Sequence, residues 1–173
     1  MISEETYVAA DECEELVVFE LAGECYGVDI STVSTIIRMQ EITTIPMASE
    51  YVDGVINLRG SIIPVINLRK RFGLPPGEQT KASRIMVVEA GGQMIGMIVD
   101  AVVETLMLPA GAVQPPLSVI SSIEADYLRG VGQQENRLVI LVDLDKVLTL
   151  KDIDSFSKHE EHVGKSSERR VAA

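Results

Sequence analysis

The sequence predicts a mainly β protein made of two similar units, each a small barrel of short strands. Three observations lead to this prediction. Runs rich in Val and Ile alternate with turns that contain Gly and Pro, which is typical of folds with many short strands. Aromatic residues make up 4% of the chain and tryptophan is absent, so the core must be aliphatic, which favours sheet. Several short motifs also occur twice in the same order, and barrel closure would remove the exposed strand edges of each unit.

The first unit opens with two predicted strands, at residues 16–21 and 25–29, joined by a Gly-containing turn. Residues 1–15 are acidic and polar, and we expect them to form a mobile leader. After Asp29, apolar residues recur at spacings of three and four, which predicts a short helix that has Asp29 as its N-cap. The apolar residues with this spacing are Ile30, Val33, Ile36 and Ile37.

The stretch from Gly54 to Arg69 is the most informative part of the chain. It contains Val-Ile-Asn-Leu-Arg twice, with Arg59-Gly60-Ser61 between the copies, and two β-branched runs around a glycine predict a β-hairpin. Pro64 has no N–H for a sheet ladder, so we expect it at an edge or a bulge. Arg59 interrupts an apolar run beside the turn, where its side chain would be presented to solvent.

Four connecting segments follow from composition. Residues 42–46 should be extended up to their proline, and residues 48–52 should form one helical turn. Residues 69–73 should form a short helix that ends at Gly73. Residues 74–81, which contain Pro-Pro-Gly, are the clearest loop in the sequence.

The second unit repeats the first. Strands are predicted at residues 84–89 and 94–99, and a second hairpin covers Gly130–Lys146. Residues 151–173 are rich in Ser, Lys, Glu and His, and we expect a polar, disordered tail.

Four pairs of motifs support the duplication, and the offset between partners grows from 69 to 76 residues, as loop insertions would make it. The pairs are Gly23-x-x-x-Gly27 with Gly92-x-x-x-Gly96, Val28-Asp29 with Val99-Asp100, Tyr51-x-x-Gly54-Val55 with Tyr127-x-x-Gly130-Val131, and Asn67-Leu68-x-Lys70 with Asp143-Leu144-x-Lys146. The units lie near residues 16–73 and 84–149. Each has about 60 residues, which is marginal for an independent core, so we expect the units to share one.

Charge and targeting signals limit the possible partners. The net charge is -11, and Arg69-Lys70-Arg71 is the only basic cluster in the body of the sequence, which argues against nucleic acid and anionic lipid. Cys13 and Cys25 show no zinc or redox spacing. No signal peptide is apparent, and no apolar run approaches the roughly 18 residues that span a bilayer. These features predict a cytoplasmic protein with no direct membrane insertion.

A search for catalytic residues gives little. His159 and His162 are the two histidines, both in the polar tail, and their spacing does not match the zinc-protease motif. Without a histidine in the body, nucleophilic triads are excluded. Asp143-x-Asp145 lacks the glycine and glutamate of a calcium loop. Asp29 and Asp100 could form a carboxylate pair, but their equivalent positions make helix capping the better interpretation. We therefore predict no enzyme activity, no cofactor and no metal.

A surface for another protein remains. Arginine is enriched at interface hot spots, and Arg59 at a hairpin turn is a plausible anchor. A plain surface charge or an internal salt bridge explains Arg59 equally well from the residues alone. Val33 and Ile36 are explained better as core residues by their spacing alone.

The chain from Leu16 to Leu150 resembles the CheW family of chemotaxis coupling proteins. The hairpin Gly54–Arg69 is similar to the signature hairpin of that family. Further matching segments are Tyr26-Gly27-Val28-Asp29, Ile42-Thr43-Thr44-Ile45-Pro46, Gly96-x-x-Val99-Asp100, Tyr127-Leu128-Arg129-Gly130-Val131 and Leu138-Val139-Ile140-Leu141-Val142-Asp143-Leu144.

The resemblance implies a CheW-like domain over 16–150, with two SH3-like five-stranded β-barrel subdomains over about 16–80 and 81–150 packed around a shared hydrophobic core. It implies a non-catalytic adaptor that couples the cytoplasmic tip of methyl-accepting chemoreceptors to the regulatory domain of the histidine kinase CheA. The protein would lie in the cytoplasm and be held at membrane receptor arrays through protein contacts.

The resemblance also implies a receptor-binding surface in the groove between the barrels. The positions that match this surface are Val33, Ile36, Gly54, Asn57 and Arg59. The kinase contact is expected at the barrel edges, largely on the second barrel.

Two positions depart from the family pattern. Thr35 stands where the family often has glutamate, which would alter a polar receptor contact, and Asn67 stands where it often has aspartate, which we expect to be structural. The second hairpin has Gln133-Gln134-Glu135-Asn136 where the first has the segment that includes Asn57 and Arg59, and this contrast favours a binding role for Arg59. The alternatives are an adaptor of a non-chemotaxis pathway, such as surface motility or pili, and a CheW-like domain of a larger signalling protein.

Overall fold

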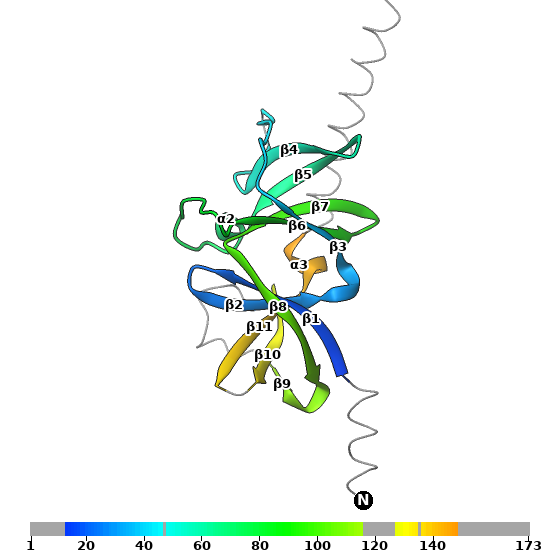
Figure 1. The fold of residues 1–173 in the computed structure, drawn as a ribbon, viewed down its shortest axis with the longest axis vertical. Coiled ribbons are helices and arrows are strands. Elements are labelled where there is room, and N and C mark those ends of the chain that lie inside the picture. The colour runs from blue at the N-terminus through cyan, green and yellow to red at the C-terminus, as the bar shows by residue number, and fades with distance from the viewer. Residues whose placement is uncertain (1–12, 47, 116–126, 135, 149–173) are drawn as a thin grey trace, which may run out of the picture.

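The computed structural model describes residues 13–46, 48–115, 127–134 and 136–148, which form short β-strands and very short helices (Figure 1). The strands are β1 (Cys13–Leu21), β2 (Glu24–Asp29), β3 (Val33–Arg38), β4 (Val52–Leu58), β5 (Ser61–Asn67), β6 (Arg84–Ala90), β7 (Gln93–Val99), β8 (Ala101–Pro109), β9 (Val113–Gln114), β10 (Leu128–Gln134) and β11 (Arg137–Val142). The helices are η1 (Ile30–Thr32), α2 (Leu68–Arg71), η2 (Ala110–Ala112) and α3 (Leu144–Val147). The prediction of a mainly β fold is confirmed.

The strands form two sheets, one in each half of the molecule, with α3 between them (Figure 1). We call the sheet with the order β8-β1-β2-β11-β10-β9 barrel A, and the sheet with the order β3-β6-β7-β5-β4 barrel B. Barrel B is continuous in sequence and is inserted between β2 and β8 of barrel A. The chain therefore crosses between the barrels twice, after Asp29 and at Asp100.

The repeat is visible in the order of the strands. In the repeat, β1 to β5 correspond in order to β6, β7, β8, β10 and β11. When each strand of barrel B is exchanged for its counterpart, the order β3-β6-β7-β5-β4 becomes β8-β1-β2-β11-β10, which is the order of barrel A without β9. The first hairpin of each repeat thus completes the barrel formed by the rest of the other repeat. Each barrel takes strands from both of the ranges 16–80 and 81–150, so the two sheets do not coincide with those two ranges.

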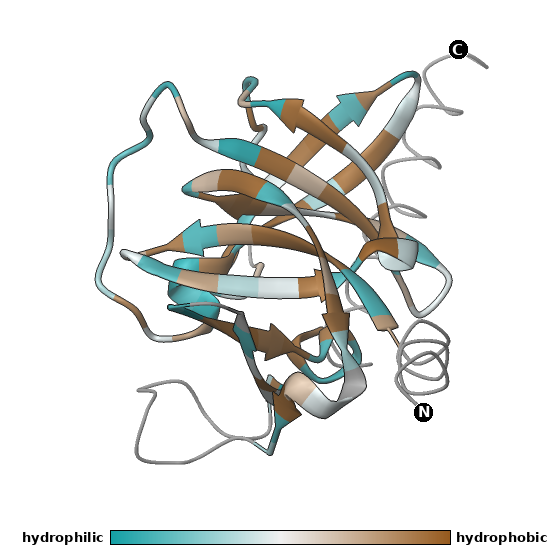
Figure 2. Cartoon of the chain, turned by 60° about the horizontal axis from the view of Figure 1, so that its bottom comes forward, coloured by the Kyte–Doolittle hydropathy of each residue, from teal (hydrophilic) through white to brown (hydrophobic). Residues whose placement is uncertain are grey.

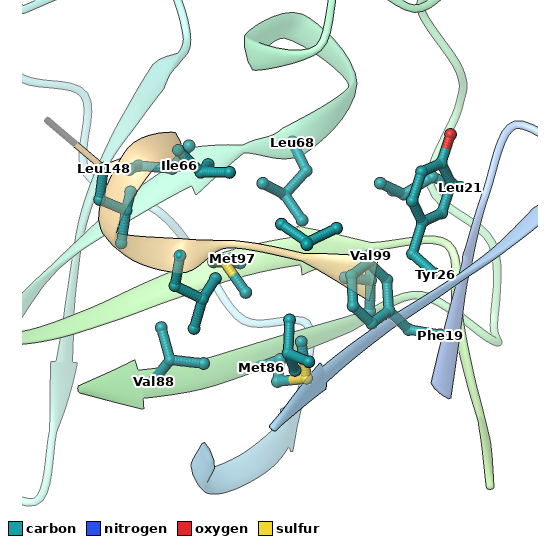
Figure 3. Close-up of a cluster of buried hydrophobic side chains, with 14 of the residues drawn as sticks. Phe19, Leu21, Tyr26, Ile66, Leu68, Met86, Val88, Met97, Val99 and Leu148 are labelled. Atoms are coloured by element: carbon teal, nitrogen blue, oxygen red, sulfur yellow. The ribbon is translucent and has the colours of Figure 1, made fainter. Parts of the chain in front are cut away.

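The hydrophobic core has three layers. One cluster that includes Leu16 and Val18 fills barrel A, and one that includes Ile85 and Val87, their counterparts 69 residues later, fills barrel B. The largest cluster lies between the barrels and takes side chains from β1 and β2 as well as β5, β6 and β7 (Figure 3). Apolar segments accordingly run along the strands, while hydrophilic ones mark the turns and loops (Figure 2). Residues 16–19 of β1 are all buried because one face serves barrel A and the other serves the shared core.

The helix predicted after Asp29 is wrong beyond its first turn. Asp29 does act as an N-cap, since its Oδ1 accepts the Ser31 N–H at 2.9 Å, but η1 ends at Thr32 and β3 follows. Four of the six β3 residues are β-branched, and such side chains lose rotamer freedom in a helix. In addition, β6 provides an antiparallel partner along the length of β3. The spacing of three and four also fits a strand that carries a bulge, as β3 does between Val33 and Thr35.

Other connections are corrected in detail. The predicted leader is too long, because residues 13–15 belong to β1 and pair with the end of β8; residues 1–12 lie outside the described residues. The predicted helical turn near residue 50 is a simple turn closed by the Val52 N–H on the Ser49 carbonyl. The polar tail 151–173 lies outside the described residues.

Pro64 lies inside β5, which has β4 on one side and β7 on the other. Pairing with β7 covers only Val65–Asn67, so Pro64 lies where that side of β5 has no strand partner among the described residues. This explains how the strand tolerates a residue that cannot donate to a ladder. The short helix before Gly73 is confirmed as α2, and Gly73 has a positive φ of 70°.

Candidate functional site

The tip of the β4–β5 hairpin is the first part of the candidate site. Leu58 and Ser61 close a two-residue turn in which Arg59 and Gly60 both have positive φ, 52° and 87°. This is the geometry of the tight turns that follow the twist of a hairpin, for which Asn-Gly is the preferred sequence. The side chain of Asn57 braces the turn, because its Oδ1 accepts the Gly60 N–H at 3.0 Å.

Arg59 is in an unfavourable backbone conformation that its own side chain does nothing to stabilise. A left-handed conformation costs a residue with a Cβ on the order of 1 kcal/mol. The β1–β2 and β6–β7 turns have positive φ at both positions as well and use Ala22-Gly23 and Gly91-Gly92. Arg59 is exposed, and its guanidinium makes no hydrogen bond or ion pair with the part of the chain that the structure describes. The internal salt bridge that the sequence left open is therefore not formed among those residues.

The segment that follows β3 lies beside this hairpin. Gln40 Nε2 donates to the Asn57 carbonyl at 3.2 Å, and Thr43 exchanges two backbone hydrogen bonds of 2.9 Å with Val55. These contacts bring the segment that follows β3 alongside β4 at Asn57 and Val55.

Ile36 and Val33 occupy β3, not a helix. Ile36 is 38% exposed and is available to a partner. Val33 is half-buried and packs against the core between the barrels, at the end of β3 away from Gln40. The structure therefore places Asn57 and Arg59 together at the hairpin tip. Ile36 lies on β3, which pairs with β6 and not with the hairpin strands among the described residues, and Val33 lies at the far end of β3 from Gln40.

Gly54 has a structural role that the sequence prediction missed. It is buried with a φ of +148°, and a Cβ at this position would lie 2.0 Å from the Thr43 carbonyl oxygen. Its counterpart Gly130 meets the Gln114 carbonyl oxygen in the same way, at 2.7 Å. The repeated glycine is needed so that the segment before each hairpin can approach its first strand.

Ile62 belongs to the candidate site although sequence reasoning did not select it. It pairs directly with Asn57 across the hairpin, and it is 43% exposed. Its counterpart in barrel A, Leu138, pairs with Gln133 and is 50% exposed. The signal was present in the sequence, because alternation in a strand with Ile63 inside puts Ile62 outside.

The two equivalent aspartates have different roles. Asp29 caps η1, and the hydrogen bonds from the Ser31 backbone and hydroxyl lower the pKa of its carboxyl, with the charge of Arg129 helping. Asp100 caps no helix, so that prediction is wrong for it. Its carboxylate accepts the Ala22 N–H at 2.9 Å and forms an ion pair with Arg69. The two aspartates do not form a carboxylate pair, since each group has its own partners.

Polar contacts elsewhere are structural. Asn67 caps α2 by accepting the Lys70 N–H, and Asp143 caps α3 by accepting the Asp145 N–H. The expectation that Asn67 is structural is therefore confirmed. Arg129 pairs with Glu14 at 2.7 Å, and this hydrogen bond raises the pKa of Arg129.

Two further features are absent from the described residues. They hold no group of three or more His, Cys, Asp or Glu side chains arranged around a common point. None of their helices has the length and apolar character needed to cross a lipid bilayer. His159 and His162 lie outside the described residues.

Comparison with known proteins identifies a family. Residues 15–152 match the family model described as the CheW-like domain. The chain is 34% identical over 151 residues to the chemotaxis protein CheW of Treponema pallidum, covering 85% of this chain and 89% of the relative. It is 35% identical over 133 residues to the chemotaxis protein CheW of Rhizobium meliloti, covering 77% and 86%.

A solved structure supports the same likeness. The crystal structure of the scaffolding protein TtCheW from Thermoanaerobacter tengcongensis matches with a TM-score of 0.74 and 38% identity, over 80% of this chain and 90% of that one. The predicted fold class, two SH3-like barrels around a shared core with short helices, is confirmed by this match together with the two sheets described above.

Proposed function

The chain belongs to the CheW family and is a non-catalytic chemotaxis adaptor, and we propose that it joins the cytoplasmic tip of a methyl-accepting chemoreceptor to the regulatory domain of the histidine kinase CheA. In this role it lies in the cytoplasm and is held at receptor arrays through protein contacts. The chemotaxis names of the relatives favour this pathway over surface motility or pili.

The observation that supports a receptor-binding hairpin is the exposed Arg59 guanidinium, which has no hydrogen bond or ion pair within the described residues. An arginine at a tight turn whose guanidinium stabilises nothing in the described part of the chain is free to contact a partner, and arginine is enriched at interface hot spots. The tip presents a cation and the exposed Ile62, on a chain whose net charge is -11. An acidic and apolar surface on a receptor helix would complement this arrangement. We assign Ile36, Asn57, Arg59 and Ile62 to the receptor surface. Of the other two predicted positions, Val33 packs against the core between the barrels, and Gly54 allows the segment at Thr43 to approach β4.

Barrel A is the better candidate for the kinase contact. It exposes three of the large hydrophobic side chains that the described residues leave open to solvent, namely Val103, Met107 and Leu138. Met107 is the most exposed of them at 56%, and it lies on β8, a strand that pairs on one side only within the described ranges. Exposed apolar residues on a free strand edge are typical of a protein-binding surface.

Binding measurements on two variants test both surfaces. We expect Arg59→Glu to weaken binding of a receptor cytoplasmic fragment and to leave binding of the kinase regulatory domain unchanged. Met107→Glu, on the edge strand β8, should have the opposite effect. Lys81→Glu is the control, since it makes the same charge change at an exposed loop residue.

The outcomes separate the parts of the proposal. Full receptor binding by Arg59→Glu would rule out the hairpin tip as the receptor surface. Full kinase binding by Met107→Glu would rule out the β8 edge of barrel A as the kinase surface. If the unmodified chain binds neither partner, the adaptor function itself is wrong.

A further inference from the structure

Arg71 lies near the axis that relates the two repeats. Its Nε donates to the Val147 carbonyl at 2.8 Å, and these two residues are counterparts, 76 positions apart. The same offset relates Tyr51 to Tyr127, and the Arg71 guanidinium carbon lies 4.6 Å from the first ring centroid and 4.8 Å from the second. A residue that touches its own counterpart and lies evenly between two others must be close to the pseudo-two-fold axis.

Each contact of Arg71 is favourable and directional. Val147 is the last residue of α3, so its carbonyl is one of the groups that a helix end leaves without an internal partner. A guanidinium is planar and can stack on aromatic faces while its edge donates hydrogen bonds. Both rings are themselves anchored, because the Tyr51 carbonyl accepts the Asn67 N–H at 2.7 Å and the Tyr127 carbonyl accepts the Asp143 N–H at 2.9 Å.

The contact joins the two barrels. Arg71 and Tyr51 flank strands of barrel B, whereas Tyr127 and Val147 flank strands of barrel A. The valine at position 147 fits this arrangement, because two guanidinium groups at one axis would repel each other. The asymmetry between the repeats at this position therefore has a physical reason.

The aromatic residues extend the junction. Phe72 stacks on Tyr127 with ring centroids 6.0 Å apart. The Tyr26 ring centroid lies 5.9 Å from that of Phe72, and the Phe19 ring centroid lies 5.9 Å from that of Tyr26. Every aromatic residue of the described ranges thus belongs to one chain of rings, in which Arg71 links Tyr51 to Tyr127.

We propose that Arg71 is a positioning residue that fixes the angle between the barrels. The shared apolar core holds the barrels together, but burial of apolar surface is not directional and does not by itself set an orientation. Arg71 supplies fixed contacts on both sides of the axis, in addition to the Arg69–Asp100 pair at the chain crossing. By fixing this angle it sets the position of the β4–β5 hairpin relative to β8 and β11. The consequence for signalling rests on the proposed function, whereas the consequence for barrel geometry does not.

The angle can be measured on the free, full-length chain. Spin labels at Ile62 and Leu138, the exposed counterparts on the two barrels, report an inter-barrel distance distribution after Cys13 and Cys25 are replaced by serine. We expect Arg71→Met, which keeps the length of the side chain without its charge or donors, to broaden or shift this distribution. Arg71→Lys keeps the cation between the rings and should restore part of the narrow distribution. Lys70→Met, one residue earlier and exposed, should leave it unchanged.

Several results would overturn the proposal. A folded Arg71→Met with the distribution of the unmodified chain excludes a positioning role. If Arg71→Met does not fold, the distance distribution of Arg71→Lys is the deciding measurement. A distribution for Arg71→Lys as narrow as that of the unmodified chain shows that the directed hydrogen bond to the Val147 carbonyl is not needed. Kinase activation in a reconstituted receptor–kinase mixture is the second measurement: Arg71→Lys should bind both partners and couple them less well. Absence of partner binding by the unmodified chain counts against the proposed function and leaves the distance result intact.

Discussion

Asp100 and Ala22 are 78 residues apart, and the Asp100 carboxylate accepts the Ala22 N–H at 2.9 Å. This bond ties the second chain crossing to the β1–β2 turn. The same carboxylate pairs with Arg69, whose Nε donates to Oδ1 at 3.0 Å and whose Nη1 donates to the Pro75 carbonyl. One aspartate thus connects the two barrels and the long loop after α2.

The stability contribution of this group should depend on pH. Partial burial acts to raise the pKa of Asp100, but the Arg69 hydrogen bond, the Ala22 N–H and the Arg69 charge together lower it below the ordinary 3.8. A carboxyl with a lowered pKa stabilises the fold fully above its ordinary value, and the contribution is lost as the pH falls through the folded-state value. We expect Asp100→Asn to lower the free energy of unfolding by about 1 kcal/mol at neutral pH.

Urea unfolding at neutral pH and at about pH 3 measures this difference. It should shrink at the lower pH, because the unmodified carboxyl is then increasingly protonated. Glu41→Gln, at an exposed carboxylate, is the control. An equal loss for Asp100→Asn at both pH values would contradict the prediction.

Arg59→Asn should separate stability from binding. Asparagine accepts the left-handed conformation and makes the preferred Asn-Gly turn, so the variant should gain about 0.5–1 kcal/mol in the free energy of unfolding. Receptor-fragment binding should weaken, because the guanidinium is lost. A variant that loses stability would show that the Arg59 side chain stabilises the folded chain through internal contacts.

Gly54→Ala should destabilise the fold strongly. The new Cβ would overlap the Thr43 carbonyl oxygen, and the backbone would keep a φ that disfavours a side chain. We expect a loss of about 3–4 kcal/mol in thermal or urea unfolding, in the range of backbone strain combined with overpacking. Gly111→Ala, where a Cβ meets nothing within 4 Å, should change stability by less than about 0.5 kcal/mol. A stable Gly54→Ala with poor receptor binding would instead make Gly54 a contact residue.

The exchange of hairpins predicts how fragments behave. A chain cut within the loop at residues 74–81 yields halves that each lack strands of both sheets. We expect each half alone to be unfolded by circular dichroism and amide exchange, and an equimolar mixture to recover the native spectrum. Independent folding of either half would contradict a strand order in which the first hairpins are exchanged.

Sequence reasoning reached the hairpin and its tip but not the pairing between repeats. The β4–β5 turn, the exposure of Arg59 and the short helix α2 follow from local chemistry, because glycine, β-branched runs and an isolated charge act over a few residues. The exchange of first hairpins could not be predicted, since β1 and β6 have similar patterns and either partner would satisfy the same hydrophobic surface. Strand partners are set by long-range packing, which one sequence does not contain explicitly.

Equivalent residues also have different roles, for reasons outside the motif. Asp29 and Asp100 have the same place in the repeat, yet only Asp100 is within reach of a guanidinium at position 69. Likewise, the spacing from Ile30 to Ile37 fits a helix as well as a bulged strand, and the presence of β6 decides between them. The prediction of Gly54 as a binding position came from resemblance, whereas the Thr43 contact explains the glycine by sterics.

The chain of rings at the junction contains all the aromatic side chains of the described residues. The sequence has no tryptophan and four tyrosines, and Tyr26, Tyr51 and Tyr127 all lie in that chain. Ultraviolet absorption, tyrosine fluorescence and near-ultraviolet circular dichroism of the described part of the chain therefore arise from the contact between the barrels and not from their outer surfaces. A change in the packing of the barrels against each other would be optically visible without any label.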